Sequence, residues 1–98
     1  MLSYPLLMIK NFKCKHTKAL YQGENPKPFR AFKAQAERKL QMLDAAVTLD
    51  FLRSPPGNQL EALTGKRQDQ YSIRINKQWR ICFVWDNEPC NVEIVDYH

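Results

Sequence analysis

The sequence has 98 residues, of which 44% are hydrophobic and 26% are charged, with 15 Lys and Arg against 10 Asp and Glu. This length suits one domain, the composition excludes a disordered chain, and no apolar run reaches the roughly 20 residues of a membrane-spanning helix. The formal charge of +5 suits a polyanionic partner, and three cysteines without a C-x-x-C pair favour a reducing compartment over a disulfide framework or a zinc site. We therefore expect a cytoplasmic, single-domain protein covering residues 1–98, with no membrane contact.

The N-terminal half is basic and begins with an apolar stretch. Pro5 interrupts this stretch, and the first lysines follow it rather than precede it, which argues against a secretory signal. Residues 1–7 are interpreted as an extension outside the fold or the product of an upstream start codon. A strand is expected at residues 8–12 and a brief basic helix at residues 13–21, which Gly23 ends. The first half has nine basic and three acidic residues, but a solvated helix face explains any single lysine there.

The clearest helix pattern lies between residues 29 and 47. Apolar residues recur there at spacings of three or four, which is typical of an amphipathic helix with one buried stripe. The members of this stripe are Phe29, Phe32, Ala36, Leu40, Leu43 and Val47. Residues 50–52 are expected to add one more turn, and Ser54-Pro55-Pro56-Gly57-Asn58 is expected to be neither helix nor central strand.

Beyond Gly57 the hydrophobic period changes from about 3.6 to 2, which indicates strands. Apolar residues alternate with other residues at 71–75 and again at 79–85, and a last strand is expected at 92–97. Helices followed by an antiparallel sheet make an α+β domain. We therefore expect N-terminal helices packed on a small antiparallel sheet.

The register of the expected hairpin has a chemical consequence. A loop of three residues sets Ile73 opposite Ile81 and Arg74 opposite Arg80, which keeps the apolar residues on one face. Like charges that face each other across a hairpin are destabilising. The polar face is therefore expected to hold an anion or to have a carboxylate close by.

Several basic and aromatic side chains between residues 66 and 85 suit RNA. The cations are Lys66, Arg67, Arg74, Lys77 and Arg80. Tyr71, Trp79 and Trp85, together with Tyr97 further along the chain, are expected surfaces for base stacking, although the spacing of the two tryptophans favours a place in the core.

RNA can be cut without a metal because its own 2′-hydroxyl is a nucleophile beside the phosphate. The protein must remove the 2′-proton, stabilise the charge on the phosphorane and protonate the departing 5′-oxygen. Arginine suits the second task and histidine either proton transfer. His98 ends a strand on which Asp96 shares its face, so Asp96 can bias the charge of the imidazole; read as structure alone, Asp96-Tyr97-His98 is a frayed terminus. No cofactor and no metal site are expected, since phosphate loops and H-E-x-x-H motifs are lacking.

Six segments between residues 8 and 98 carry a family resemblance. They are Met8-Ile9-Lys10-Asn11-Phe12-Lys13, Arg53-Ser54-Pro55-Pro56-Gly57-Asn58, Leu60-Glu61-Ala62-Leu63, Tyr71-Ser72-Ile73-Arg74-Ile75-Asn76, Gln78-Trp79-Arg80-Ile81-Cys82-Phe83 and Val92-Glu93-Ile94-Val95-Asp96-Tyr97-His98. Together they strongly resemble the HigB-like killer proteins of the RelE toxin superfamily.

The resemblance implies a compact RelE-like fold and a toxin of a type II toxin–antitoxin pair. It implies a ribosome-dependent mRNA endonuclease that enters the A site of the 70S ribosome, cuts the bound mRNA and so inhibits translation. It also implies a HigA-like antitoxin with a helix-turn-helix, through which alone the toxin would meet operator DNA.

The resemblance also implies roles for individual residues. Carried over to this sequence, the catalytic residues are Arg80, Asp96, Tyr97, His98 and Lys66, and the RNA-binding residues are Arg67, Arg74, Lys77 and Tyr71. The chain departs from the family at Thr64, where a lysine is common, and at Glu61, where some members carry histidine. Lys66 replaces the missing charge in this reading, because it lies in the same turn as Thr64.

Two other functions stay open at this stage. One is a non-catalytic, basic regulator that binds the ribosome or nucleic acid and acts with a helix-turn-helix partner. A weakened toxin that binds more than it cuts is a related alternative. The other is a ribonuclease that needs no ribosome, which the small number of acid and base groups disfavours.

Overall fold

The hairpin expected in the C-terminal half forms the middle of the sheet. The computed structural model describes residues 9–96. Within that part of the chain, four strands pair antiparallel in the order β1-β2-β3-β4. They are β1 Glu61–Ala62, β2 Tyr71–Arg74, β3 Trp79–Trp85 and β4 Pro89–Asp96. Ile73 lies opposite Ile81 and Arg74 lies opposite Arg80, so the predicted register is confirmed.

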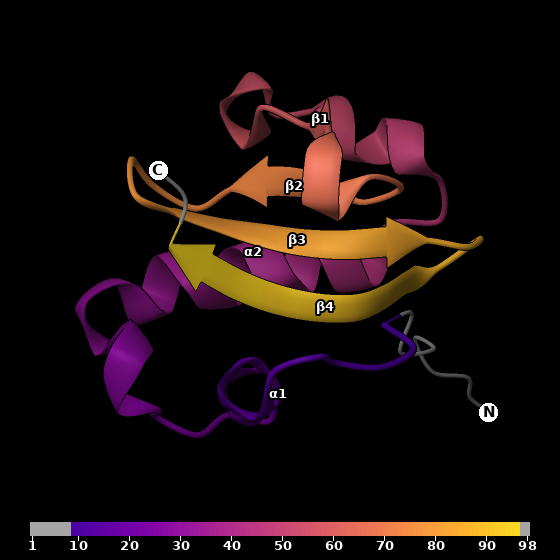
Figure 1. Ribbon diagram of the computed structural model, residues 1–98. Coiled ribbons are helices and arrows are strands. Elements are labelled where there is room, and N and C mark those ends of the chain that lie inside the picture. The colour runs from indigo at the N-terminus through magenta and orange to yellow at the C-terminus, as the bar shows by residue number, and fades with distance from the viewer. Residues whose placement is uncertain (1–8, 97–98) are drawn as a thin grey trace, which may run out of the picture.

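Both α-helices precede the sheet in sequence, and the second covers one of its faces. The α-helices are α1 Lys15–Tyr21 and α2 Lys33–Ala45, and 3-10 helices lie at Lys27–Phe32, Leu49–Arg53, Pro56–Asn58 and Gly65–Arg67. In Figure 1, α2 runs behind β3 and α1 lies next to β4. The expected α+β architecture is therefore confirmed. Across residues 9–96, no helix has the length and apolar character needed to cross a membrane.

The core lies between α2 and the covered face of the sheet. Its members include Phe29, Phe32, Ala36, Leu40 and Leu43 from the helical side and Ile73, Ile81, Phe83, Val92 and Ile94 from the strands. Trp79 stacks on Phe32 with ring centroids 5.0 Å apart, and Trp85 also packs against this core. Both tryptophans are therefore partly buried and pack against the core, which agrees with the expectation from their period-2 spacing.

The amphipathic stripe between residues 29 and 47 is not one continuous helix. Its first two phenylalanines lie in the 3-10 helix Lys27–Phe32, where a proline occupies the first turn, and α2 starts only at Lys33. At the other end, α2 stops at Ala45, and Ala46 has an extended backbone. Val47 is therefore 68% exposed, and its expected place in the buried stripe is wrong.

Two further expectations about local structure need correction. The strand expected at 8–12 is, in its described part, only a parallel bridge between Phe12 and Val92, because the chain turns into α1 before a longer ladder can form. Pro56–Asn58 forms one 3-10 turn, which the sequence argued against; a proline is tolerated there because the first turn does not need its N–H. The last strand begins at Pro89, earlier than expected.

Candidate functional site

Arg80 lies on the face of the sheet that α2 leaves uncovered. Side chains alternate along β3, so the inward position of Ile81 directs Arg80 to the opposite face. The residue is only 8% exposed. Its Nε donates to Ser72 Oγ at 2.8 Å, and its Nη2 donates to the Gln59 carbonyl at 2.6 Å. These two bonds fix the plane of the guanidinium, because its N–H groups form a rigid fork.

A carboxylate lies beside this guanidinium. Glu61 Oε1 is 3.4 Å from Arg80 Nη2, and the Glu61 side chain is 51% exposed, whereas that of Arg80 is 9% exposed. The ion pair therefore has one end in the protein and one end in solvent. This is the nearby carboxylate that the facing arginines led us to expect.

The remaining groups of the hairpin end are arranged around the 76–78 loop. Arg74 Nε donates to the Asn76 carbonyl at 3.0 Å, and the Lys77 side chain is exposed in the loop. Asp96, at the end of β4, accepts a bond from Gln78 Nε2 at 2.9 Å. Arg74, Lys77 and Asp96 therefore gather at the same end of the sheet as Arg80.

Asp96 and Arg80 do not share a face of the sheet. In the β3–β4 register, Asp96 lies opposite Trp79 and Arg80 lies opposite Val95, so the two charged side chains leave the strands in opposite directions. Tyr97 and His98, the other predicted catalytic residues of the C terminus, lie outside the described residues.

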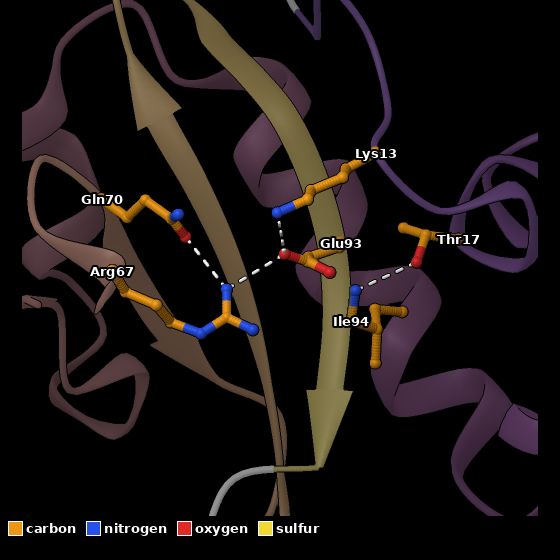
Figure 2. A network of polar contacts seen from close by, with 6 residues as sticks. All are labelled: Lys13, Thr17, Arg67, Gln70, Glu93 and Ile94. Atoms are coloured by element: carbon orange, nitrogen blue, oxygen red, sulfur yellow. Dashed lines mark hydrogen bonds and ion pairs between the residues drawn. The ribbon is translucent and has the colours of Figure 1, made fainter. Parts of the chain in front are cut away.

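Arg67 takes part in a network that joins three segments (Figure 2). Its Nη1 donates to Glu93 Oε2 at 3.0 Å and to Gln70 Oε1 at 3.1 Å. Lys13 Nζ lies 3.6 Å from the same Glu93 oxygen, from the segment that leads into α1. The Glu93 side chain is 15% exposed, so the carboxylate is largely removed from water and compensated by two cations. These contacts give Arg67 a structural role in addition to the RNA contact predicted for it.

Cys82 lies between Ser72 and Glu93 in the ladder of this face. Burial raises the pKa of its thiol, although Arg67, Arg80 and Lys13 act in the opposite direction. The protonated thiol is therefore the favoured form. A thiol that stays protonated is a poor nucleophile, and Cys82 is a packing residue of the site.

Tyr71 and Lys66 are the remaining predicted site residues in the described part of the chain. Tyr71 lies opposite Phe83 and stacks on it, with ring centroids 6.2 Å apart. It therefore belongs to the face that carries Ile73, not to the face of Arg80. Lys66 is exposed in the 3-10 helix Gly65–Arg67.

Sequence reasoning missed three direct neighbours of Arg80. Ser72 could have been found, because the predicted alternation places it on the same face as Arg74 and Arg80. The Gln59 carbonyl could not, because a backbone group in a loop leaves no trace in periodicity. Glu61 stood out only as a departure from a family histidine, with nothing to indicate its distance from Arg80. Among residues 9–96, no cluster of three or more His, Cys, Asp and Glu side chains has a geometry suited to a metal ion.

The chain is similar to a described protein family and to two curated proteins. Residues 10–98 match the family model described as the RelE-like toxin of the type II toxin–antitoxin system HigB. An uncharacterized protein of Haemophilus influenzae is 44% identical over 61 residues, which cover 62% of this chain and 60% of that protein. Toxin HigB-1 of Vibrio cholerae is 52% identical over 48 residues, 49% of this chain and 50% of that toxin. The chain thus spans between half and three fifths of the length of these curated relatives.

Proposed function

The chain belongs to the family of RelE-like HigB toxins of type II toxin–antitoxin systems, and from that premise we propose that it inhibits translation by cutting ribosome-bound mRNA. The observation that carries the proposal is Arg80, a buried arginine held by Ser72 and Gln59 beside the half-exposed Glu61. A guanidinium fixed by two hydrogen bonds suits a phosphate that gains charge during reaction, because its orientation is set before the substrate binds.

The proposed reaction uses the substrate's own nucleophile. The 2′-oxygen forms a bond to the adjacent phosphorus, the bond from phosphorus to the 5′-oxygen breaks, and the products are a 2′,3′-cyclic phosphate and a 5′-hydroxyl. One group must take the 2′-proton and another must give a proton to the 5′-oxygen. The reaction as written needs no metal, because the nucleophile and both proton transfers come from RNA and side chains.

Arg80 and Glu61 perform two of the tasks of catalysis, which are the stabilisation of the phosphorane and the removal of the 2′-proton. Arg80 stabilises the phosphorane through charge-assisted hydrogen bonds, for which a bidentate guanidinium is better suited than an ammonium. Glu61 accepts the 2′-proton, because its carboxylate is half exposed and only 3.4 Å from Arg80 Nη2. A phosphate bound to Arg80 therefore brings the 2′-hydroxyl within reach of Glu61.

The C terminus completes the proposed site. His98 protonates the 5′-oxygen, since imidazole changes its charge near neutral pH. Tyr97 stacks on or bonds to the nucleotide, and Asp96 biases the charge of the imidazole. Lys66, Arg67, Arg74, Lys77 and Tyr71 are proposed to contact the RNA, with Lys66 replacing the charge that Thr64 lacks.

The proposed partners follow from the family. A HigA-like antitoxin with a helix-turn-helix would bind the toxin, and only this complex would bind operator DNA. The substrate would be mRNA in the A site of the 70S ribosome in the cytoplasm. The dependence on the ribosome agrees with the small set of acid and base groups around Arg80, because the ribosome would supply the alignment that a free ribonuclease must build for itself.

A non-catalytic regulator that binds the ribosome or nucleic acid is the second candidate. The excess of basic residues in the first half of the chain favours it. Primer extension on cellular mRNA after a brief induction separates the two functions. Cleavage predicts new mRNA ends that disappear in the His98→Ala variant, whereas a regulator that only binds would arrest translation without new ends.

A further inference from the structure

Arg80 is held from one side by a loop rather than by a strand. The loop is the segment 54–61, which leads from the 3-10 helix Leu49–Arg53 into β1. It contributes the Gln59 carbonyl, which accepts the 2.6 Å bond from Arg80 Nη2, and it ends in Glu61. The orientation of the guanidinium therefore depends on where this loop is fixed.

The loop is fixed by Asn58. This side chain is fully buried, and its Nδ2 donates to the Leu52 carbonyl at 3.1 Å and to the Ser54 carbonyl at 3.4 Å. Its Oδ1 accepts a bond of 2.5 Å from Lys39 Nζ, on α2. A buried amide is costly unless its donors and acceptor are satisfied. Here the partners come from the 3-10 helix Leu49–Arg53, from the loop itself and from α2.

The contact with Lys39 ties the loop to the helical layer. Burial, together with the neighbouring Arg38, lowers the pKa of the Lys39 ammonium, which agrees with an ammonium drawn toward the protein interior. The long side chain can reach Asn58 because its aliphatic part covers apolar surface. A second bond to α2 runs from Asn58 Nδ2 to Met42 Sδ at 3.0 Å. Two hydrogen bonds thus connect α2 to the segment that holds Arg80.

The backbone between Asn58 and Arg80 is set in an uncommon conformation. Gln59 follows Asn58 directly and has a left-handed backbone with φ of 45° and ψ of 54°. A residue with a side chain keeps this conformation only where its surroundings determine it. Here the Gln59 N–H donates to the Pro56 carbonyl at 3.0 Å, and the Gln59 carbonyl accepts from Arg80, while the buried Asn58 holds the preceding position.

We propose that Asn58 is a positioning residue for Arg80, which it orients through the Gln59 carbonyl, with Lys39 as the outer anchor. The catalytic consequence rests on the proposed function, but the geometric claim does not. In this scheme Asn58 acts on the guanidinium through the Gln59 carbonyl and does not bind the substrate. It also gives a physical reason for the Arg53-Ser54-Pro55-Pro56-Gly57-Asn58 segment, which the catalytic scheme leaves unexplained.

The geometric claim is tested by NMR on the free protein. The side-chain Nε–H signal of Arg80 is assigned by its absence from the Arg80→Lys spectrum. In the wild-type chain we expect slow solvent exchange of this hydrogen, because Ser72 accepts its bond in a buried place. In Asn58→Ala we expect exchange on the order of tenfold faster, since hydrogen exchange follows local opening.

Matched variants separate positioning from a general loss of stability. Leu20→Ala removes a buried side chain from α1 and is destabilising without touching the loop, so it should leave the Arg80 signal in place. Lys39→Met should change the signal in the same direction as Asn58→Ala but less, and Lys39→Arg should restore it. If Asn58→Ala does not fold, the exchange rate of the Arg80 Nε–H hydrogen in Lys39→Met tests the proposal instead. The proposal is overturned if this exchange rate is unchanged in folded Asn58→Ala or, where that variant does not fold, in Lys39→Met.

Kinetics on ribosome-bound mRNA then test the consequence. We expect Asn58→Ala to lower kcat by roughly tenfold to a hundredfold with little change in KM, because a misplaced catalytic group costs rate rather than binding. In an Arg80→Ala background the same substitution should have no further effect on kcat. A fully additive loss overturns the positioning role. A wild-type chain that does not cut mRNA contradicts the proposed function, while the NMR result still decides the geometric claim.

Discussion

Arg80 and Glu61 form an ion pair in which a buried guanidinium meets a half-exposed carboxylate at 3.4 Å between Nη2 and Oε1. The two residues come from different strands, β3 and β1, and are 19 positions apart in the sequence. In the proposed reaction, this pair places the phosphate-binding group and the proton acceptor side by side.

Glu61→Gln should slow mRNA cleavage while preserving the fold. The amide keeps the size of the side chain but cannot accept the 2′-proton, and general base catalysis contributes about 10²- to 10⁴-fold. Asp86→Asn is the matched control, because Asp86 is an exposed carboxylate in the β3–β4 turn, at the other end of β3 from Arg80. Single-turnover cleavage of ribosome-bound mRNA measures both. Equal rates for Glu61→Gln and Asp86→Asn would remove Glu61 from the mechanism.

Arg67→Ala and Lys77→Ala should separate structural from RNA-binding charge. Arg67 is bonded to Glu93, so its loss leaves a largely buried carboxylate with a weaker partner and should lower the free energy of unfolding by about 1–3 kcal/mol. Lys77 is exposed in a loop, so Lys77→Ala should change stability by less than about 0.5 kcal/mol.

Urea unfolding and ribosome binding at several salt concentrations give the two readouts. If Lys77 contacts a phosphate, Lys77→Ala reduces the slope of log affinity against log salt by about one. An unchanged slope would remove Lys77 from the RNA contacts. An Arg67→Ala chain as stable as the wild type would show that the Glu93 network contributes nothing to the fold.

Tyr21 should make stability depend on alkaline pH. Burial, followed by the hydrogen bond to Asp44 and its negative charge, raises the pKa of Tyr21 from 10.0 to about 12. Because the folded pKa lies above the unfolded one, the stabilisation is fully present below pH 10 and is lost as pH rises toward 12. Tyr21→Phe should keep the ring contact with Phe12 but lose this pH-dependent part.

Urea unfolding of the wild type and Tyr21→Phe between pH 8 and pH 12 tests this. The difference between their free energies of unfolding should be constant up to about pH 10 and should shrink above it. A difference that is constant to pH 12, or that grows, would contradict the shifted pKa.

The central hairpin was predictable because its pattern is local. Ile73 and Ile81 stand at alternating apolar positions in two strands that a short loop joins. The alternation gave the face of the sheet on which each side chain lies, and the loop length gave the register of the strands. The predicted burial of Val47 was wrong because the same kind of pattern does not show where an element ends. A periodic pattern gives the face of a helix but not its end, and the chain leaves the helix at Ala45, two residues earlier.

The surroundings of Arg80 were predictable only in part. Arg80 itself, its partner Arg74 and the polar face followed from alternation and from the family resemblance. The contacts with Gln59 and Glu61 depend on how the segment 54–61 folds back over the sheet. That path is set by the buried Asn58, whose bonds to backbone carbonyls have no counterpart in hydrophobic periodicity.

The most direct test of the proposed function is cleavage of a defined mRNA by the purified chain, with and without 70S ribosomes, read by primer extension. The wild type should produce new ends only when ribosomes are present. Arg80→Ala, His98→Ala and the double variant should lose about 10²-fold or more of this activity, with folds checked by circular dichroism. A double variant that cuts ribosome-bound mRNA at the wild-type rate would contradict the assigned site, and wild-type protein that produces no new ends would contradict the proposed cleavage itself.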